Sequence, residues 1–229
     1  MTLALVIVES SIELVPNEIV HHSSVKANAA KKRRDPSQLI LDQNYHHAAI
    51  LGLGPSGVGR GRPDIAHICL LVALGSPLNL DDKLRCFIHT RDNYVITIDP
   101  SARLPRSTDR FTSLLEQLYQ DSAAPLKGKP LMSLRKQTIQ QLLGQISPDI
   151  VIGLTTLGTA SPMDFVAREI ANAKTPVLLI GGFPVGHFSA PTANLATSNY
   201  RIDRRKLEAS TVVSRAIYDY EKAISLPRF

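Results

Sequence analysis

The sequence predicts a single α/β domain with a largely parallel sheet, and three apolar runs are the main basis for this prediction. Residues 3–8 (LALVIV), 149–154 (DIVIGL) and 176–182 (PVLLIGG) are short, apolar and rich in β-branched side chains. Continuous runs of this kind are typical of strands that are buried on both faces. Patterns with helical spacing lie between them, and one buried core can be built over residues 1–229.

The segment that follows the first strand is predicted to be a loop-rich insertion at about 25–61. It contains the basic run KKRR at 31–34 and the glycine-rich run GLGPSGVGRG at 52–61. A short helix is expected between them, at 42–51. The KKRR run is interpreted as a solvated loop, with a contact to RNA as the alternative.

Helices and one hairpin complete the predicted domain. A helix is expected at 63–74, because proline stands in its first turn and glycine follows its last residue. Two short β-rich runs joined by a polar turn predict a β-hairpin inserted into the core at about 84–98. Apolar side chains at steps of three and four predict helices at 106–120 and at 203–225, the second with Asp203 as its cap.

Composition limits the classes of function. The formal net charge of +6 suits a polyanionic partner. Cys69 and Cys86 have no metal-binding spacing, so we expect two buried thiols. The apolar runs fall short of the roughly 20 residues that a membrane-spanning helix needs, and the amino terminus lacks the features of a signal peptide. We therefore expect a cytoplasmic protein that makes no contact with a membrane.

Three patterns that could indicate other chemistry are set aside. Residues 52–57 match the GxGxxG dinucleotide pattern, but Pro55 and the glycines after it favour a loop where that motif needs a helix. The adjacent histidines at 21–22 and 46–47 have no partner motif for a metal ion, so no metal site is predicted. The serine and lysine motifs of hydrolases and P-loop enzymes are missing.

A group of arginines is the first candidate site. Arg62 and Asp64 stand two residues apart at the start of a predicted helix, and Arg103, Arg106 and Arg110 follow at steps of three and four. If 106–120 is helical, Arg106 and Arg110 share one face, and their guanidinium groups can grip successive phosphates. Asp64 would orient the Arg62 side chain or act as a base, and orientation is the favoured role. A salt-bridged surface is the alternative for the whole group.

The second candidate site is the run GGFPVGHF at 181–188, which is followed by ATSNYRI at 196–202. Glycines at the carboxyl edge of a parallel sheet let a ligand approach the backbone, which is how many such sheets hold cofactors. Tight turns without a ligand are the alternative interpretation.

Taken in order, the segments GRPDIAHICLLVALGSPLN (61–79), IHTRDNYVITIDPSARLPRSTDRF (88–111), GGFPVGHF (181–188) and SNYRI (198–202) resemble the archaeal and eukaryotic small-subunit ribosomal RNA pseudouridine N1-methyltransferases. The resemblance covers nearly the whole chain. It implies a SPOUT methyltransferase fold, in which the carboxyl-terminal part is threaded as a deep trefoil knot, and it implies a homodimer.

The resemblance also assigns roles to residues. It implies that Arg62, Arg103, Arg106 and Arg110 face the RNA, with Asp64 steadying Arg62. It implies a pocket for S-adenosylmethionine, without a metal, that is formed by Thr156, Gly181, Gly186, Thr197, Ser198, Asn199, Tyr200, Arg201 and Ile202. Many relatives have Tyr-Pro-Leu where this chain has Tyr-Arg-Ile at 200–202.

The implied reaction is in-line transfer of a methyl group to N1 of a pseudouridine in a loop of small-subunit rRNA, as part of ribosome biogenesis. Two other functions stay open at this point. One is an assembly factor that binds rRNA without catalysis, which need not bind S-adenosylmethionine. The other is a SPOUT enzyme that acts on transfer RNA.

Overall fold

A single mixed sheet forms the centre of the molecule. The computed structural model describes residues 2–125 and 127–226, and all bounds below refer to these. The strand order is β4-β5-β3-β2-β1-β7-β6-β8. The strands are β1 (Leu3–Ser10), β2 (Leu84–Thr90), β3 (Tyr94–Ile98), β4 (Ala123–Ala124), β5 (Met132–Lys136), β6 (Ile150–Ala160), β7 (Pro176–Gly181) and β8 (Ser198–Arg201). The five strands from β2 to β8 in this order run parallel, and β3, β5 and β4 add antiparallel pairs at one edge.

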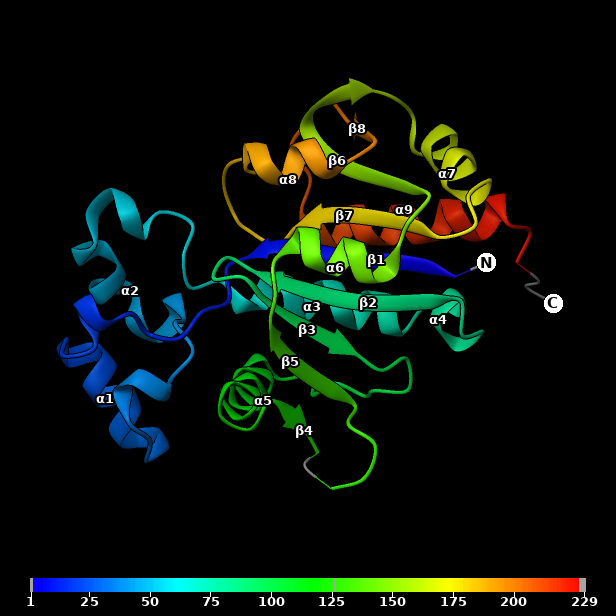
Figure 1. Cartoon of the computed structure of the whole chain (residues 1–229). Coiled ribbons are helices and arrows are strands. Elements are labelled where there is room, and N and C mark those ends of the chain that lie inside the picture. Colours follow the sequence, from blue (N-terminus) through cyan, green and yellow to red (C-terminus); the bar gives the residue numbers. More distant parts are fainter. Residues whose placement is uncertain (1, 126, 227–229) are drawn as a thin grey trace.

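Helices cover both faces of this sheet (Figure 1). Helices α3, α5, α7 and α9 pack on one face in the largest hydrophobic cluster, and α6 packs on the other face in a second cluster. The helices are α1 (Ser23–Lys32), α2 (Gln43–Gly52), α3 (Pro63–Leu74), α4 (Pro77–Leu80), α5 (Thr108–Asp121), α6 (Ile139–Ile146), α7 (Met163–Ala171), α8 (Ala190–Leu195) and α9 (Ala209–Ala223), with short 3-10 turns at Asn17–Ile19, Pro36–Gln38 and Gly54–Gly57.

The strands predicted at 3–8, 149–154 and 176–182 are confirmed as β1, β6 and β7. They are apolar because their side chains alternate between two apolar layers. In β1, Leu3, Leu5 and Ile7 belong to the α3 side of the sheet, whereas Val6 and Val8 belong to the α6 side. All five side chains are at most 1% exposed. Burying one such side chain stabilises the fold by about 1.5–3 kcal/mol, which explains why a run without polar residues forms the middle of the sheet.

The two strands of the hairpin predicted at 84–98 form, but their position in the fold differs from the prediction. Strand β2 pairs antiparallel with β3, with Cys86 opposite Ile98. The same β2 pairs in parallel with β1, where Leu5 is opposite Cys86. The two strands are therefore part of the central sheet, because β2 is apolar on both faces and is covered by helices, and they are not an insertion beside it.

The loop-rich segment predicted at about 25–61 is a small helical lobe, which we call the α1–α2 lobe (residues 15–61; Figure 1). The helix expected at 42–51 is α2, but the residues before the KKRR run also form a helix, α1. A third, separate hydrophobic cluster inside the lobe includes Val25, Ala29, Leu39 and Leu41. The prediction of a loop was wrong over 25–32, where α1 buries a narrow apolar face against α2 and not against the sheet, whereas Arg33 and Arg34 lie outside the helix.

Two predicted helix starts also need correction. Helix α9 begins at Ala209 with Glu208 as the preceding residue, so Asp203 does not cap it. Helix α5 begins at Thr108 with Ser107 before it, so Arg106 lies outside the helix. In both cases the apolar periodicity located the buried face, with Phe111 and Val213 fully buried, but it did not locate the first turn.

Histidine 46 makes the stability of the lobe sensitive to acid. The ring is 1% exposed and its Nδ1 accepts a hydrogen bond from the backbone N–H of Asp42 at 3.1 Å. Burial, and then the charge of Lys32, lowers the pKa of His46 to about 4. The folded protein thus keeps the ring neutral, while the unfolded chain takes up a proton below pH 6.5. Stability is therefore lost as the pH falls from 6.5 towards 4.

We expect this histidine to contribute about 2 to 3 kcal/mol of the stability lost between pH 7 and pH 4.5. Urea denaturation of the protein and of His46→Gln at both pH values gives the free energies of unfolding that measure this contribution. Glutamine keeps a hydrogen-bond acceptor and does not titrate, so the variant should lose less stability between the two pH values. An equal loss of stability in both proteins would contradict the assignment.

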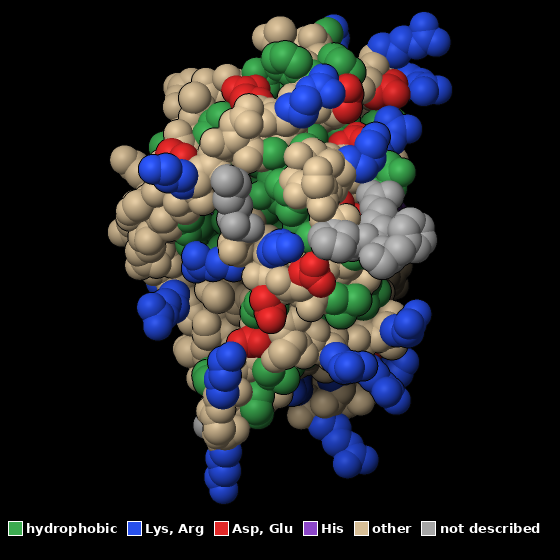
Figure 2. All heavy atoms as spheres, turned by 90° about the vertical axis from the view of Figure 1, so that its right-hand side faces the viewer, with side chains coloured by type: hydrophobic (Ala, Val, Ile, Leu, Met, Phe, Trp, Pro, Cys, Tyr) green, Lys and Arg blue, Asp and Glu red, His purple; other side chains and the backbone are tan. Residues whose placement is uncertain are grey.

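The end of the sheet opposite the α1–α2 lobe carries a mixed surface. Basic side chains there are spread over the face and interspersed with acidic ones (Figure 2). Within residues 2–125 and 127–226, no helix is long and apolar enough to cross a membrane.

Candidate functional site

A pocket lies at the carboxyl end of β7, where its parallel pairing with β6 ends, beside β8. Six of the nine predicted cofactor residues line it, namely Thr156, Gly181, Gly186, Tyr200, Arg201 and Ile202. Its walls are apolar at Leu154, Ile180 and Leu207. This is the edge of an open α/β sheet at which ligands commonly bind.

Two glycines shape this pocket. Gly186 has a φ of +98°, a backbone conformation that L side chains rarely adopt. A Cβ atom at Gly181 would lie 2.7 Å from the ring of Phe183, which is itself part of the pocket wall. The glycine-rich loop therefore keeps the end of β7 open to a ligand.

Thr197, Ser198 and Asn199 support the pocket and are not among its lining residues. The backbone N–H of Thr197 donates to the carbonyl of Val151 at 2.7 Å, and Ser198 lies opposite Ile152 in the register of β8 with β6. The side chain of Asn199 donates to the carbonyl of Ala193 at 2.9 Å. These contacts fix β8 against β6, so this part of the predicted set positions the strand that carries Tyr200.

Charged and aromatic side chains complete the rim of the pocket. Asp203 accepts hydrogen bonds from the Arg205 guanidinium at 3.1 and 3.3 Å, and these bonds lower the pKa of Asp203 to about 2. The Lys206 ammonium donates to the carbonyl of Pro184, which joins the two loops that border the pocket. Thr156 is hydrogen-bonded to Nδ1 of His187 at 3.0 Å.

Asp203 and Lys206 were not predicted as pocket residues, because a helix capped by Asp203 was expected over 203–225. A signal was available, since DRRK at 203–206 directly follows the SNYRI run.

A second, more polar cavity adjoins the first pocket, and both are lined by Phe183 and His187. Glu9 lies in it with a φ of +51°, and its carboxylate accepts hydrogen bonds from the Ser189 backbone at 3.1 Å and from the Thr192 hydroxyl at 2.6 Å. Helix α8 is thereby fixed to the end of β1. This cavity could not be predicted from the sequence, because its residues come from five separate segments.

Arg62 and Asp64 form the fork that their spacing predicts. Nε and one terminal nitrogen of Arg62 donate to the two carboxylate oxygens of Asp64 at 2.8 and 2.7 Å. This pairing raises the pKa of Arg62. Pro63 occupies the first turn of α3, so the fork stands at the start of that helix. Both oxygens of Asp64 are thus occupied in holding the guanidinium.

The other three arginines, Arg103, Arg106 and Arg110, are exposed. Within the described parts of the chain, none of them lies within 4.0 Å of a carboxylate oxygen, so the alternative of a salt-bridged surface does not hold for these three. Because α5 begins at Thr108, Arg106 precedes the helix and does not share a helical face with Arg110. Unpaired guanidinium groups remain able to bind phosphate.

His67 connects the two arginine segments and was not identified from the sequence. It lies on α3, is 1% exposed, and its Nε2 donates to the carbonyl of Pro105 at 2.7 Å. The ring also stacks on Phe111 of α5, with centroids 4.4 Å apart. Burial lowers the pKa of His67, which keeps the ring neutral. The loop that carries Arg103 and Arg106 is therefore fixed to α3, the helix that directly follows Arg62.

The patterns set aside from the sequence have structural roles. Gly52 ends α2 and residues 54–57 form a 3-10 turn. The GxGxxG run therefore follows a helix where the dinucleotide motif needs a strand, and it does not open an α-helix. Cys69 and Cys86 are buried and unpaired, and burial raises both thiol pKa values to about 12. In the described residues, no group of three or more His, Cys, Asp or Glu side chains could hold a metal ion.

Comparison with known proteins adds the following similarities. A family model described as EMG1/NEP1 methyltransferase matches residues 5–221. The chain is 41% identical over 219 residues to the ribosomal RNA small subunit methyltransferase Nep1 of Pyrococcus furiosus, with 96% of each chain covered. It is 41% identical over 224 residues to the protein of that name from Thermococcus kodakarensis, covering 98% of this chain and 100% of the relative. The crystal structure of Archaeoglobus fulgidus Nep1 bound to S-adenosylhomocysteine superposes with a TM-score of 0.86 at 27% identity, covering 98% and 100% of the two chains.

Proposed function

Because this chain belongs to the EMG1/NEP1 methyltransferase family, we propose that it methylates N1 of a pseudouridine in small-subunit rRNA, with S-adenosylmethionine as the donor. The observation that carries the proposal is the glycine-lined pocket at the end of β7, combined with full-length similarity to rRNA small subunit methyltransferases. The similar structure from Archaeoglobus fulgidus binds S-adenosylhomocysteine, which is the demethylated form of this donor.

The residues of the pocket suit S-adenosylmethionine. Ile180, Ile202 and Leu207 offer apolar contact to an adenine ring, and the open backbone at Gly181 and Gly186 offers amide and carbonyl groups. The carboxylate of Asp203, ionised at neutral pH, suits an ammonium or hydroxyl group at the rim. When bound, the donor supplies an electrophilic methyl group on a sulfonium.

Arg62 is the residue that we propose to act on the target base. N1 of pseudouridine must lose its proton around the time of attack, which leaves negative charge on the ring. A guanidinium held in one orientation by Asp64 stabilises that charge. Both Asp64 oxygens already accept hydrogen bonds from Arg62, and this supports orientation over proton abstraction as the role of Asp64. Solvent is then the acceptor of the proton.

The exposed cations support an RNA loop as the substrate. Arg103, Arg106 and Arg110 have no acidic partner in the described chain, and arginine forks bind phosphate in bidentate geometry. The cavity that shares Phe183 and His187 with the cofactor pocket offers a place for an unpaired base beside the methyl donor.

The remaining expectations from the resemblance are part of the same proposal. Adjacent strands β7, β6 and β8, followed by a chain that returns to pack α9 on α3, suit the trefoil knot of SPOUT enzymes. Large apolar side chains that stay exposed, such as Leu157 at 72% and Phe165 at 50%, suit a homodimer interface. We place the enzyme in the cytoplasm, where the ribosomal subunit is assembled.

Two measurements test this function against its alternatives. Digestion of a treated rRNA hairpin to nucleosides, followed by mass spectrometry, should show methylated pseudouridine, whereas unmodified transfer RNA should gain no methyl group. Calorimetry should show S-adenosylmethionine binding to the protein without RNA. RNA binding without donor binding would instead indicate an assembly factor, and methyl transfer to transfer RNA would indicate the other class of SPOUT enzyme.

A further inference from the structure

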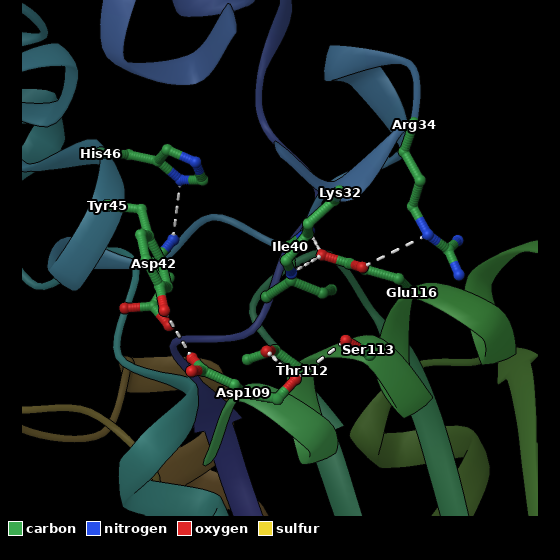
Figure 3. A network of polar contacts seen from close by, with 10 residues as sticks. All are labelled: Lys32, Arg34, Ile40, Asp42, Tyr45, His46, Asp109, Thr112, Ser113 and Glu116. Atoms are coloured by element: carbon green, nitrogen blue, oxygen red, sulfur yellow. Dashed lines mark hydrogen bonds and ion pairs between the residues drawn. The ribbon is translucent and has the colours of Figure 1, made fainter. Parts of the chain in front are cut away.

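The KKRR run separates into two pairs with different surroundings. Lys31 and Lys32 end α1, and Arg33 follows with a left-handed backbone conformation. Lys31 and Arg33 are exposed, whereas Lys32 and Arg34 are partly buried and turn towards α5 (Figure 3). The run is therefore not a uniform basic surface.

The inward pair meets a buried carboxylate. Glu116 on α5 is 0% exposed, and one of its oxygens accepts hydrogen bonds from Lys32 Nζ at 2.6 Å and from the backbone N–H of Ile40 at 3.3 Å. Arg34 Nε lies 3.7 Å from the other oxygen. The two hydrogen-bond donors and the Arg34 cation all belong to the α1–α2 lobe, and we call this set the Glu116 cluster. A carboxylate without water is stable only with such partners.

Polar contacts supply much of the connection between the lobe and the sheet. The lobe has its own hydrophobic cluster. Among the described residues, Ile40 is the one residue of the lobe that belongs to the buried part of the largest cluster, which lies between the sheet and α3. A second link is the hydroxyl of Tyr45, which donates to Asp109 on α5 at 2.8 Å (Figure 3). Loss of the Glu116 cluster would therefore weaken the docking of the lobe more than the folding of the sheet.

The start of α2 lies between the two arginine segments. The backbone N–H of Gln43 donates to the carbonyl of Gly61, the residue before Arg62, at 2.9 Å. Tyr45 binds Asp109, the residue before Arg110. Asp42 is close enough to both sides that, after burial, the charges of Asp64 and Asp109 raise its pKa. The lobe therefore ends, at Gly61, directly before Arg62, and it contacts the segment of Arg110 through Tyr45.

We propose that Glu116 is a positioning residue, which docks the α1–α2 lobe through Lys32 and Arg34 and so holds Arg62 and Arg110 in the arrangement that binds RNA. This role rests on the proposed function. Undocking lowers the fraction of molecules that can bind RNA, so the apparent affinity falls by that fraction, while saturating RNA restores the docked state. The effect therefore appears in KM for RNA and not in kcat.

Charge-neutralising variants with a matched control test this role. Glu116→Gln and Lys32→Met are each expected to raise KM for the rRNA hairpin about 10-fold, with kcat and the Kd for S-adenosylmethionine within about twofold of the original values. The double variant should be no worse than the more affected single one. Lys26→Met removes the same charge from an exposed position earlier in α1 and should change KM less than twofold. Hydrogen exchange should speed up in α1 and α2 and stay unchanged in β1 and β7.

Several results would overturn the proposal. Equal losses of RNA affinity in Lys31→Met and Lys32→Met, with a shallower salt dependence in both, would make the run a direct RNA contact. A fall in kcat, or unchanged hydrogen exchange in the lobe, would also contradict it. If Glu116→Gln fails to fold, Tyr45→Phe offers a second test. It removes the hydrogen bond to Asp109 and leaves no buried charge without a partner, and it should show the same pattern more weakly. If the protein binds the RNA hairpin but does not methylate it, the proposed function is wrong and the role of Glu116 is still testable. In that case the Kd for RNA and the hydrogen exchange of the variants decide whether Glu116 docks the lobe.

Discussion

Replacing Gly181 by valine is expected to weaken binding of S-adenosylmethionine at least about 100-fold, or about 2.7 kcal/mol, and to abolish methyl transfer. A Cβ atom at this position would lie 2.7 Å from the Phe183 ring, so the ring must move from the pocket wall, and the two valine methyl groups would take space that the ligand needs. Isothermal titration calorimetry with the donor measures the loss directly.

The control for this substitution is Gly144→Val on α6. Gly144 is exposed, and a Cβ atom there would meet no atom within 4 Å. We expect that variant to bind the donor normally. RNA binding should persist in Gly181→Val, because the arginines lie on other segments. Normal donor affinity in Gly181→Val would mean that the cofactor does not occupy this pocket.

Removal of the Arg62 guanidinium is the second large effect that we expect. Arg62→Ala should lower kcat by about 100- to 1000-fold, the range typical of losing one group that stabilises developing negative charge. Arg62→Lys should restore little activity, because an ammonium cannot form the fork that the two Asp64 oxygens accept. Single-turnover methyl transfer at saturating RNA and donor measures the rate constant of the chemical step without product release, and it should fall by the same factor.

A double-mutant cycle separates the two roles of Asp64. If Asp64 only orients Arg62, then Arg62→Ala/Asp64→Ala is no slower than Arg62→Ala alone. If Asp64 is the base, the double variant loses a further large factor, and the rate no longer falls at low pH. Arg168→Ala is the matched control, because Arg168 pairs with Asp164 on the exposed surface of α7 at 3.1 Å, and its loss should leave kcat unchanged.

Local patterns were enough to predict the centre of the fold. The run at 3–8 is apolar at every position, short and rich in β-branched side chains, which is typical of a strand covered on both faces. Helix α3 was located to the residue, because a proline and a glycine mark its ends. The pairing of Arg62 with Asp64 was also predicted from their nearness in the sequence, and it forms because Arg62 stands before α3 in a non-helical conformation from which its side chain reaches Asp64 in the first turn.

The features that were missed depend on partners far away in the sequence. Glu116 meets Lys32 across 84 residues, and His67 meets Pro105 across 38. Neither pairing leaves a local pattern, so a buried carboxylate and a buried imidazole looked like ordinary members of amphipathic helices. Helix α1 was missed for a related reason, because the hydrophobic surface that it covers belongs to the lobe and not to the main sheet. Long-range pairings of this kind required the folded structure.

The most direct test of the proposed function is transfer of a labelled methyl group from S-adenosylmethionine to a short rRNA hairpin that carries either pseudouridine or uridine at one loop position. Only pseudouridine presents a free N1 nitrogen, since its sugar is attached through carbon. We predict label on the pseudouridine hairpin and none on the uridine hairpin. Equal label on both hairpins, or tight binding of both without any label, would contradict the assignment of this protein as a pseudouridine N1-methyltransferase.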